Sequence, residues 1–151
     1  MTATRKFFFQ FESLLQVLQN RRNLRRHLLA QVLINDRALI EQRQEIERNR
    51  AGQLDELRGF GKTGEVAVDR SASRRDFAGQ LLGDIGLVEC RRELVQQQLQ
   101  LCRTALVKAD QDVKVLEKLA EKQRSEHLYR QERCAARELE DVWSSMQLTE
   151  V

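Results

Sequence analysis

The stretch from Arg74 to about Met146 constrains this chain more than any other feature. It contains no proline, and its apolar or small residues recur at alternating steps of four and three, the seam spacing of a coiled coil. At about 1.5 Å per residue, a helix of this length would extend on the order of 110 Å. A second helix must therefore cover it. The seam positions, interrupted only at Arg92, are Ile85, Val88, Val95, Leu99, Cys102, Leu106, Ala109, Val113, Leu116 and Ala120.

Composition supports an elongated helical protein. The chain has 151 residues, of which 32% are charged and 5% aromatic, and none is proline. Its length fits one domain, and its Leu, Gln, Glu, Arg and Ala content is typical of long helices. Cys90, Cys102 and Cys134 have no metal-binding spacing and suit a reducing compartment. No stretch approaches the ~20 apolar residues of a membrane span, so we expect a cytosolic protein without direct membrane insertion.

The covering helix is predicted over about residues 5–58. Its apolar positions follow the same alternating spacing, but several are occupied by polar residues. Such a seam is poor for self-pairing and suits a single partner helix, with long side chains reaching out to solvent. The apolar positions are Phe11, Leu15, Leu18, Leu29, Val32, Leu39, Ile46 and Leu57, and the polar ones are Arg22, Arg25, Asp36, Arg43, Arg50 and Gln53.

A glycine-rich turn is predicted between the two helices, at about 59–73. Gly59, Gly61 and Gly64 end a helix and allow a reversal, and Ser73 with Asp76 resembles a capping box for a second helix over about 74–147. If the turn centres near residue 66, facing residues sum to about 132, and the apolar positions of the two helices coincide almost throughout. The pairs include Leu57 with Phe77, Ile46 with Ile85, Val32 with Leu99, Leu18 with Val113 and Phe11 with Ala120. The sequence thus predicts an all-α fold: one domain, an antiparallel coiled-coil hairpin with a longer C-terminal helix.

The longer helix is predicted to outrun its cover at about residue 127. Beyond that point the seam turns polar, and apolar residues return only at Leu139, Val142, Trp143 and Met146. At the other end of the chain, Phe7, Phe8, Phe9 and Phe11 are more aromatics than one partner helix can cover. We therefore expect the end of the molecule that holds both termini to dock into another protein.

Chemical sites are not indicated. The Gly61-Lys62 pair resembles a phosphate-binding loop, but Glu56 stands where that motif requires a glycine, and a helix rather than a strand precedes it. His27 and His127 are the only histidines, and neither has ligand or nucleophile partners at a useful spacing. We expect no catalytic residues, no metal and no cofactor.

A basic band occupies residues 21–27. Arg21 with Arg25, and Arg22 with Arg26, are one helical turn apart. The first 58 residues carry 11 Lys and Arg against 7 Asp and Glu, which makes this half the more suitable for an acidic partner. Two interpretations remain open: the arginines pair with Asp110 and Asp112 inside the molecule, or they meet an acidic surface of another protein. Gly79, Gly83, Gly86 and Cys90 similarly form either a weak helical stretch or a close-contact surface.

Two segments resemble the flagellar FliJ family. The opening KFFFQFESLLQVLQNRR has the family's aromatic and leucine pattern before a long basic helix. Residues 115–142 resemble its C-terminal signature. The matching residues there are Leu116, Glu117, Lys118, Leu119, Tyr129, Glu138, Leu139 and Glu140. Length and two-helix plan agree over the whole chain, whereas Gly79, Gly83, Gly86 and Trp143 depart from the family.

The resemblance implies a component of the flagellar type III export apparatus. Such a protein is not an enzyme; it acts as a central stalk in the hexameric export ATPase and contacts the cytoplasmic domain of the export gate and export chaperones. It implies a cytoplasmic location, peripheral to the cytoplasmic face of the cell membrane. The expected partner-binding residues are Phe7, Phe8, Arg21, Arg22, Arg25, Arg26, Leu116, Lys118, Leu119, Tyr129, Arg130 and Leu139.

Two alternatives stand beside this hypothesis. The stalk of a virulence type III secretion system would have the same architecture. A generic coiled-coil adaptor or nucleic-acid-binding protein is the other. Against nucleic acid stand the net charge of only +3 and the lack of aromatic stacking platforms.

Overall fold

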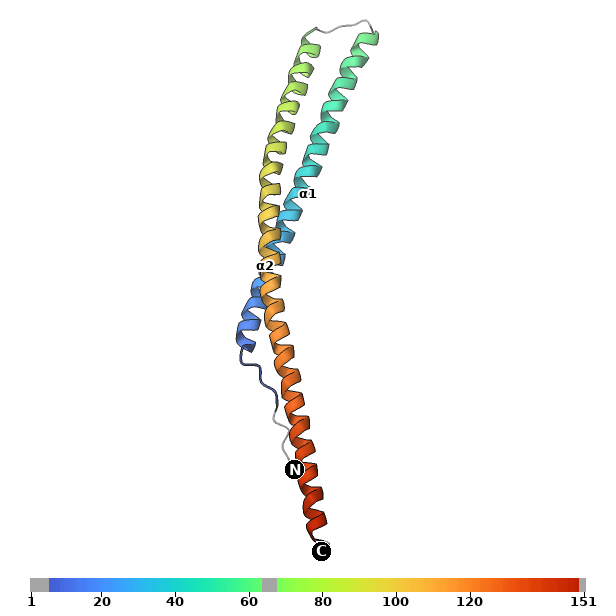
Figure 1. Ribbon diagram of the computed structural model, residues 1–151. Coiled ribbons are helices and arrows are strands. Elements are labelled where there is room, and N and C mark those ends of the chain that lie inside the picture. The colour runs from blue at the N-terminus through green and yellow to red at the C-terminus, as the bar shows by residue number, and fades with distance from the viewer. Residues whose placement is uncertain (1–5, 64–67, 150–151) are drawn as a thin grey trace. The chain divides into compact units, whose positions relative to one another are not determined.

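Two long helices make up the described part of the chain. A computed structural model describes residues 6–63 and 68–149, with α1 at Glu12–Thr63 and α2 at Val68–Thr149 (Figure 1). The side chains described are those of residues 6–61 and 68–146. These residues contain no strand, and the two helices are in contact. The prediction of an all-α fold with a longer second helix is confirmed.

The helix bounds differ from the predicted ones. α1 begins at Glu12 rather than near Arg5, and it continues through Gly59 and Gly61 to Thr63. A glycine inside a helix costs only about 1 kcal/mol relative to alanine, which long flanking helices tolerate. α2 already begins at Val68, so Ser73 lies inside it and its hydroxyl donates to the Asp69 carbonyl at 3.0 Å instead of capping. The described residues of the predicted turn over 59–73 are helical, so that prediction is wrong for them, whereas residues 64–67, which include Gly64, lie outside the described residues.

Contacts divide the chain into two units, which are described separately. The first unit comprises residues 1–24 and 107–151, and the second comprises residues 25–106. Each unit contains a segment of α1 and a segment of α2. The single-domain organisation stays a prediction.

The seam of the second unit follows the predicted spacing. On α2 the buried side chains are Ala78, Leu81, Ile85, Val88 and Leu99. On α1 the same interface is only half-buried, because polar residues interrupt it where the sequence predicts. The predicted seam positions of α1 that are half-buried are Leu29, Val32, Asp36, Leu39, Arg43, Ile46, Arg50, Gln53 and Leu57. The predicted pairing of Leu57 with Phe77 is wrong: Ala78 holds the seam position, and Phe77, one residue away, is turned about 100° around the helix and exposed.

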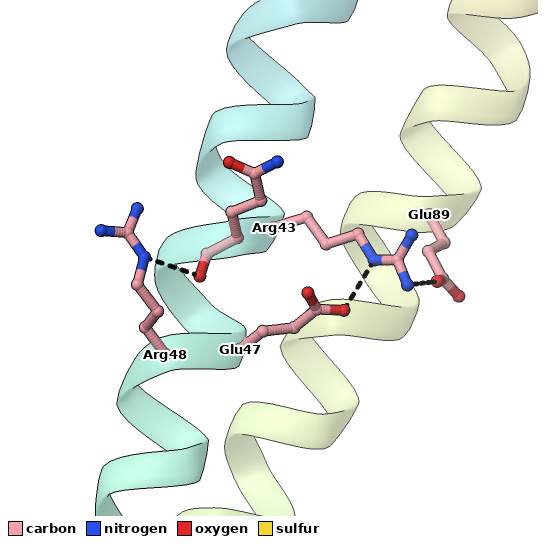
Figure 2. Close-up of polar contacts among 5 residues, drawn as sticks. Arg43, Glu47, Arg48 and Glu89 are labelled. Atoms are coloured by element: carbon pink, nitrogen blue, oxygen red, sulfur yellow. Dashed lines mark hydrogen bonds and ion pairs between the residues drawn. The ribbon is translucent and has the colours of Figure 1, made fainter.

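Charged pairs join the helices in the second unit. The Asp36 carboxylate accepts hydrogen bonds from Arg92 at 3.1 Å and Gln96 at 2.9 Å. Arg43 forms ion pairs with Glu47 on its own helix and with Glu89 on α2, at 3.0 and 3.1 Å (Figure 2).

Arg74 on α2 contacts three residues of α1. It pairs with Glu56, donates to Gln53 at 3.2 Å and lies over the Phe60 ring at 5.4 Å.

The direction of these pairs is antiparallel within the unit. As residue numbers increase along α1 from Asp36 to Glu56, the numbers of their partners on α2 decrease from Arg92 to Arg74. The hairpin over the whole chain stays a prediction, since residues 64–67 lie outside the described ranges. No helix in the described ranges is both long and apolar enough to cross a bilayer.

Candidate partner-binding surface

A small aromatic and aliphatic core organises the first unit. Phe9, Leu15 and Val113 are its buried members, and Val113 is fully buried. Partly buried side chains pack around them, namely Phe7, Leu18, Leu116, Leu119 and Ala120. The core therefore lies between the start of α1, the residues that precede it, and the middle of α2. It fixes how the N-terminal aromatics are presented.

Residues 6–11 form a non-helical segment against α2, which we call the aromatic strap. Burial alternates along it: Phe7 and Phe9 face the core, while Phe8 is 82% exposed. This alternation is the side-chain period of an extended chain rather than of a helix. The strap leads into α1 through a hydrogen bond from the Glu12 amide to the Phe9 carbonyl at 3.2 Å.

A shallow hollow lies where the aromatic strap meets α2. Its lining combines apolar residues with charged residues of both signs, namely Phe7, Phe8, Phe9, Ala120, Lys6, Glu12, Glu121 and Arg124. It is a surface feature open to solvent and suits one protruding apolar side chain of a partner, with polar groups around it.

The described cover of α2 reaches His127, but through the aromatic strap rather than through the predicted helix from Arg5, because α1 begins only at Glu12. The Phe7 ring lies against the His127 ring with centroids 5.7 Å apart and planes tilted by 45°, and the other side of His127 contacts the Gln131 amide at 3.0 Å. From Glu132 to Met146 every side chain is exposed. Figure 1 shows α2, in orange and red, continuing past the start of α1. The exposed end carries Leu139, Val142, Trp143 and Met146.

The basic band does not act as one group. Arg22 is half-buried and pairs with Asp110 on α2 at 3.7 Å, and Lys114 approaches the same carboxylate at 2.9 Å. Arg21 is exposed in the first unit, and Arg25 and Arg26 are exposed in the second. Arg22 therefore follows the intramolecular interpretation, while the other three arginines stay accessible.

The remaining predicted partner-binding residues have different environments. Leu116 and Leu119 are partly buried against the core, so they support the surface rather than form it. Lys118 is exposed. Arg133 lies over the exposed Tyr129 ring at 5.8 Å, and Arg130 approaches Glu126 at 4.0 Å. Leu139 is 71% exposed. Of the predicted partner-binding residues on α2, the exposed ones are therefore Lys118, Tyr129, Arg130 and Leu139.

Two features of this surface are missing from the sequence prediction. Phe9 is the aromatic that enters the core, whereas Phe7 and Phe8 were expected to be the functional ones. Leu128 is exposed although it lies directly beside the half-buried His127. The signal for the second feature is present in the spacing, because Leu128 continues a pattern through Leu139 and Met146 that is offset from the seam.

The described residues hold no cluster of His, Cys, Asp or Glu that could bind a metal ion. Comparison of the chain with protein-family models, with curated proteins and with solved structures gives no match.

Proposed function

We propose that the chain is a non-enzymatic stalk and coupling protein of flagellar type III export, which enters the hexameric export ATPase with the end that holds both termini. The proposal combines the resemblance of residues 6–22 and 115–142 to the FliJ family with one observation. That observation is the uncovered end of α2, where every side chain from Glu132 to Met146 is exposed. The finer architecture, an antiparallel coiled-coil hairpin, belongs to the same proposal.

The chemistry of the exposed end supports a protein partner. The exposed end of α2 carries four large apolar side chains, namely Leu139, Val142, Trp143 and Met146. An apolar surface of this kind typically marks a site where another protein binds. Tryptophan, tyrosine and arginine are enriched at protein–protein contacts, and Trp143, Tyr129 and Arg130 all lie here. Phe8 adds an exposed aromatic at the aromatic strap.

The mechanism would be mechanical. When an asymmetric rod lies inside a ring of identical subunits, each subunit contacts a different set of the rod's side chains. Because each subunit's nucleotide state is biased by its own contacts, the rod couples those states to one another. Export-gate and chaperone contacts would then fall on the second unit, where Arg25 and Arg26 are exposed. The protein would work in the cytoplasm, peripherally at the membrane.

Matched charge substitutions test this assignment. Leu139→Glu and Leu101→Glu alter side chains that are equally exposed, at 71% each, on the same helix but in different units. We expect Leu139→Glu to reduce co-purification with the export ATPase by at least about tenfold, which corresponds to roughly 1.4 kcal/mol, and Leu101→Glu to leave it unchanged. Equal binding by both variants contradicts the role of the α2 end.

A further inference from the structure

The exposed end of α2 carries a second apolar stripe, distinct from the seam. We call it the tail stripe. Its residues recur at steps of four, three, four, three and four, again the spacing of a coiled coil. It is offset by one residue from the seam position His127, which turns it about 100° around the helix. The tail stripe consists of Leu128, Glu132, Ala135, Leu139, Val142 and Met146.

The tail stripe is open to solvent over its whole length. Its large members, Leu128, Leu139, Val142 and Met146, are between 51% and 71% exposed. A helix with a solvent-exposed stripe of this spacing is stabilised when a second helix packs along the stripe. The question is which helix fits.

A second copy of the same segment fits in antiparallel orientation. With Arg137 at the centre, facing residues sum to 274. Leu128 then meets Met146 of the second copy, and Ala135 meets Leu139 of the second copy, so that a small side chain opposes a large one. Glu132 meets Val142 rather than another carboxylate. Complementary sizes of this kind fill the space between two helices without gaps.

The flanks of the tail stripe agree with this register. Tyr129 of one copy comes beside Trp143 of the other, and aromatic pairs contribute about 0.5–1.5 kcal/mol beyond their area. The two copies of Ala136 come within about 3 Å of each other along the helix axis, one on each side of the two-fold axis, where a small residue allows close approach. The two copies of Glu138 also come close together, and the repulsion between their carboxylates weakens the dimer. A parallel arrangement is worse, because it places Glu132 against Glu132 within the stripe itself.

We propose that the chain forms a weak, reversible antiparallel homodimer through the tail stripe, residues 128–146. A contact between two helices of about 28 Å belongs to the small, transient class of interfaces, below about 1,200 Å², so we expect a dissociation constant in the micromolar range. The inference does not depend on the export role. If both hold, the ATPase ring and the second copy compete for the same surface.

Sedimentation equilibrium of the full chain over about 1–300 µM tests the dimer. We expect a monomer–dimer equilibrium that Leu139→Glu shifts at least tenfold toward monomer and that the equally exposed Leu101→Glu leaves unchanged. Glu132→Leu should tighten the dimer at least threefold, because it completes the stripe. Helical content by circular dichroism checks that each variant is folded. A monomer at every concentration, or a dimer that Leu139→Glu does not weaken, overturns the proposal, and the first outcome leaves the stripe to a different protein.

Single cysteines test the orientation. In a background with Cys90→Ser, Cys102→Ala and Cys134→Ser, oxidation should cross-link Ala136→Cys to its own copy. Tyr129→Cys should give no such cross-link, since the two copies of residue 129 would be about 24 Å apart along the axis. Cross-linking of Tyr129→Cys as efficient as that of Ala136→Cys indicates a parallel pair and overturns the antiparallel register. Neither readout involves the export ATPase, so each can fail without bearing on the export role.

Discussion

Phe7 of the aromatic strap and His127 of α2 meet ring to ring with centroids 5.7 Å apart. On one side of this pair the α2 seam is packed against the aromatic strap and α1. On the other side the Gln131 side chain is half-buried, and from Glu132 to Met146 every side chain of α2 is exposed. The contact therefore marks where the structural part of the first unit ends and the exposed end of α2 begins.

The aromatic strap is expected to contribute to stability through its inward-facing side chains, Phe9 above all, and not through Phe8. Phe9 is 5% exposed within the core, whereas Phe8 is 82% exposed. Phe9→Ala should lower the free energy of unfolding by about 3 kcal/mol, the lower part of the range for buried phenylalanine, and Phe8→Ala by less than about 0.5 kcal/mol. Urea unfolding followed by circular dichroism measures both. Similar losses for the two variants would show that the strap does not pack in this alternating manner.

The charged pair Asp36 and Arg92 is expected to specify the helix pairing at the expense of stability. The Asp36 side chain is only 14% exposed and also accepts from Gln96. Asp36→Leu alone should destabilise by about 1–3 kcal/mol, because Arg92 and Gln96 lose their acceptor. The double variant Asp36→Leu with Arg92→Leu should regain that loss and exceed the wild-type stability by about 1 kcal/mol. A double variant less stable than Asp36→Leu alone contradicts this expectation.

The Arg43–Glu89 pair (Figure 2) is expected to contribute little. Both side chains are more than one third exposed, at 38% and 48%, so solvent and salt screen their attraction. A double-mutant cycle to alanine should give a coupling of about 0.5 kcal/mol at low salt, and it should vanish in 1 M salt, where the screening length is about 3 Å. A coupling above about 1.5 kcal/mol that persists in salt would mean that the pair is less hydrated than its exposure indicates.

Glycines inside α2 are expected to be replaceable. A Cβ added at Gly83 or Gly86 meets nothing within 4 Å, and both positions are helical. Gly83→Ala and Gly86→Ala should each raise the free energy of unfolding by about 0.5–1 kcal/mol, seen as a higher urea midpoint. If either variant instead loses binding to an export partner while gaining stability, the small-residue stripe is a close-contact surface, the other interpretation that the sequence leaves open.

Much of the architecture could be predicted because coiled-coil spacing is a strong signal. The seam positions Ile85, Val88, Leu99 and Val113 are all buried, and Arg22 meets Asp110, as the pairing predicts. Each of these depends only on periodicity and on the relative lengths of two helices.

The helix ends and the aromatic strap could not be predicted in the same way. Gly59, Gly61 and Ser73 are typical of turns, yet the long flanking helices continue through them, because the cost of each residue is small beside the tertiary contacts of its helix. Four phenylalanines within five residues satisfy a helical and an extended pattern about equally. Only packing against Val113 and Leu15 selects Phe9 as the buried one.

Hydrogen exchange of the chain with and without the hexameric export ATPase is the most direct test of the central claim, that the uncovered end of α2 is the partner-binding surface. The chain should be dilute enough to be monomeric. We expect amides of residues 132–146 to exchange rapidly in the free chain and to become at least tenfold protected in the complex, while residues 82–101 are unchanged. Protection confined to residues 82–101, with residues 132–146 as rapid as before, would contradict the account.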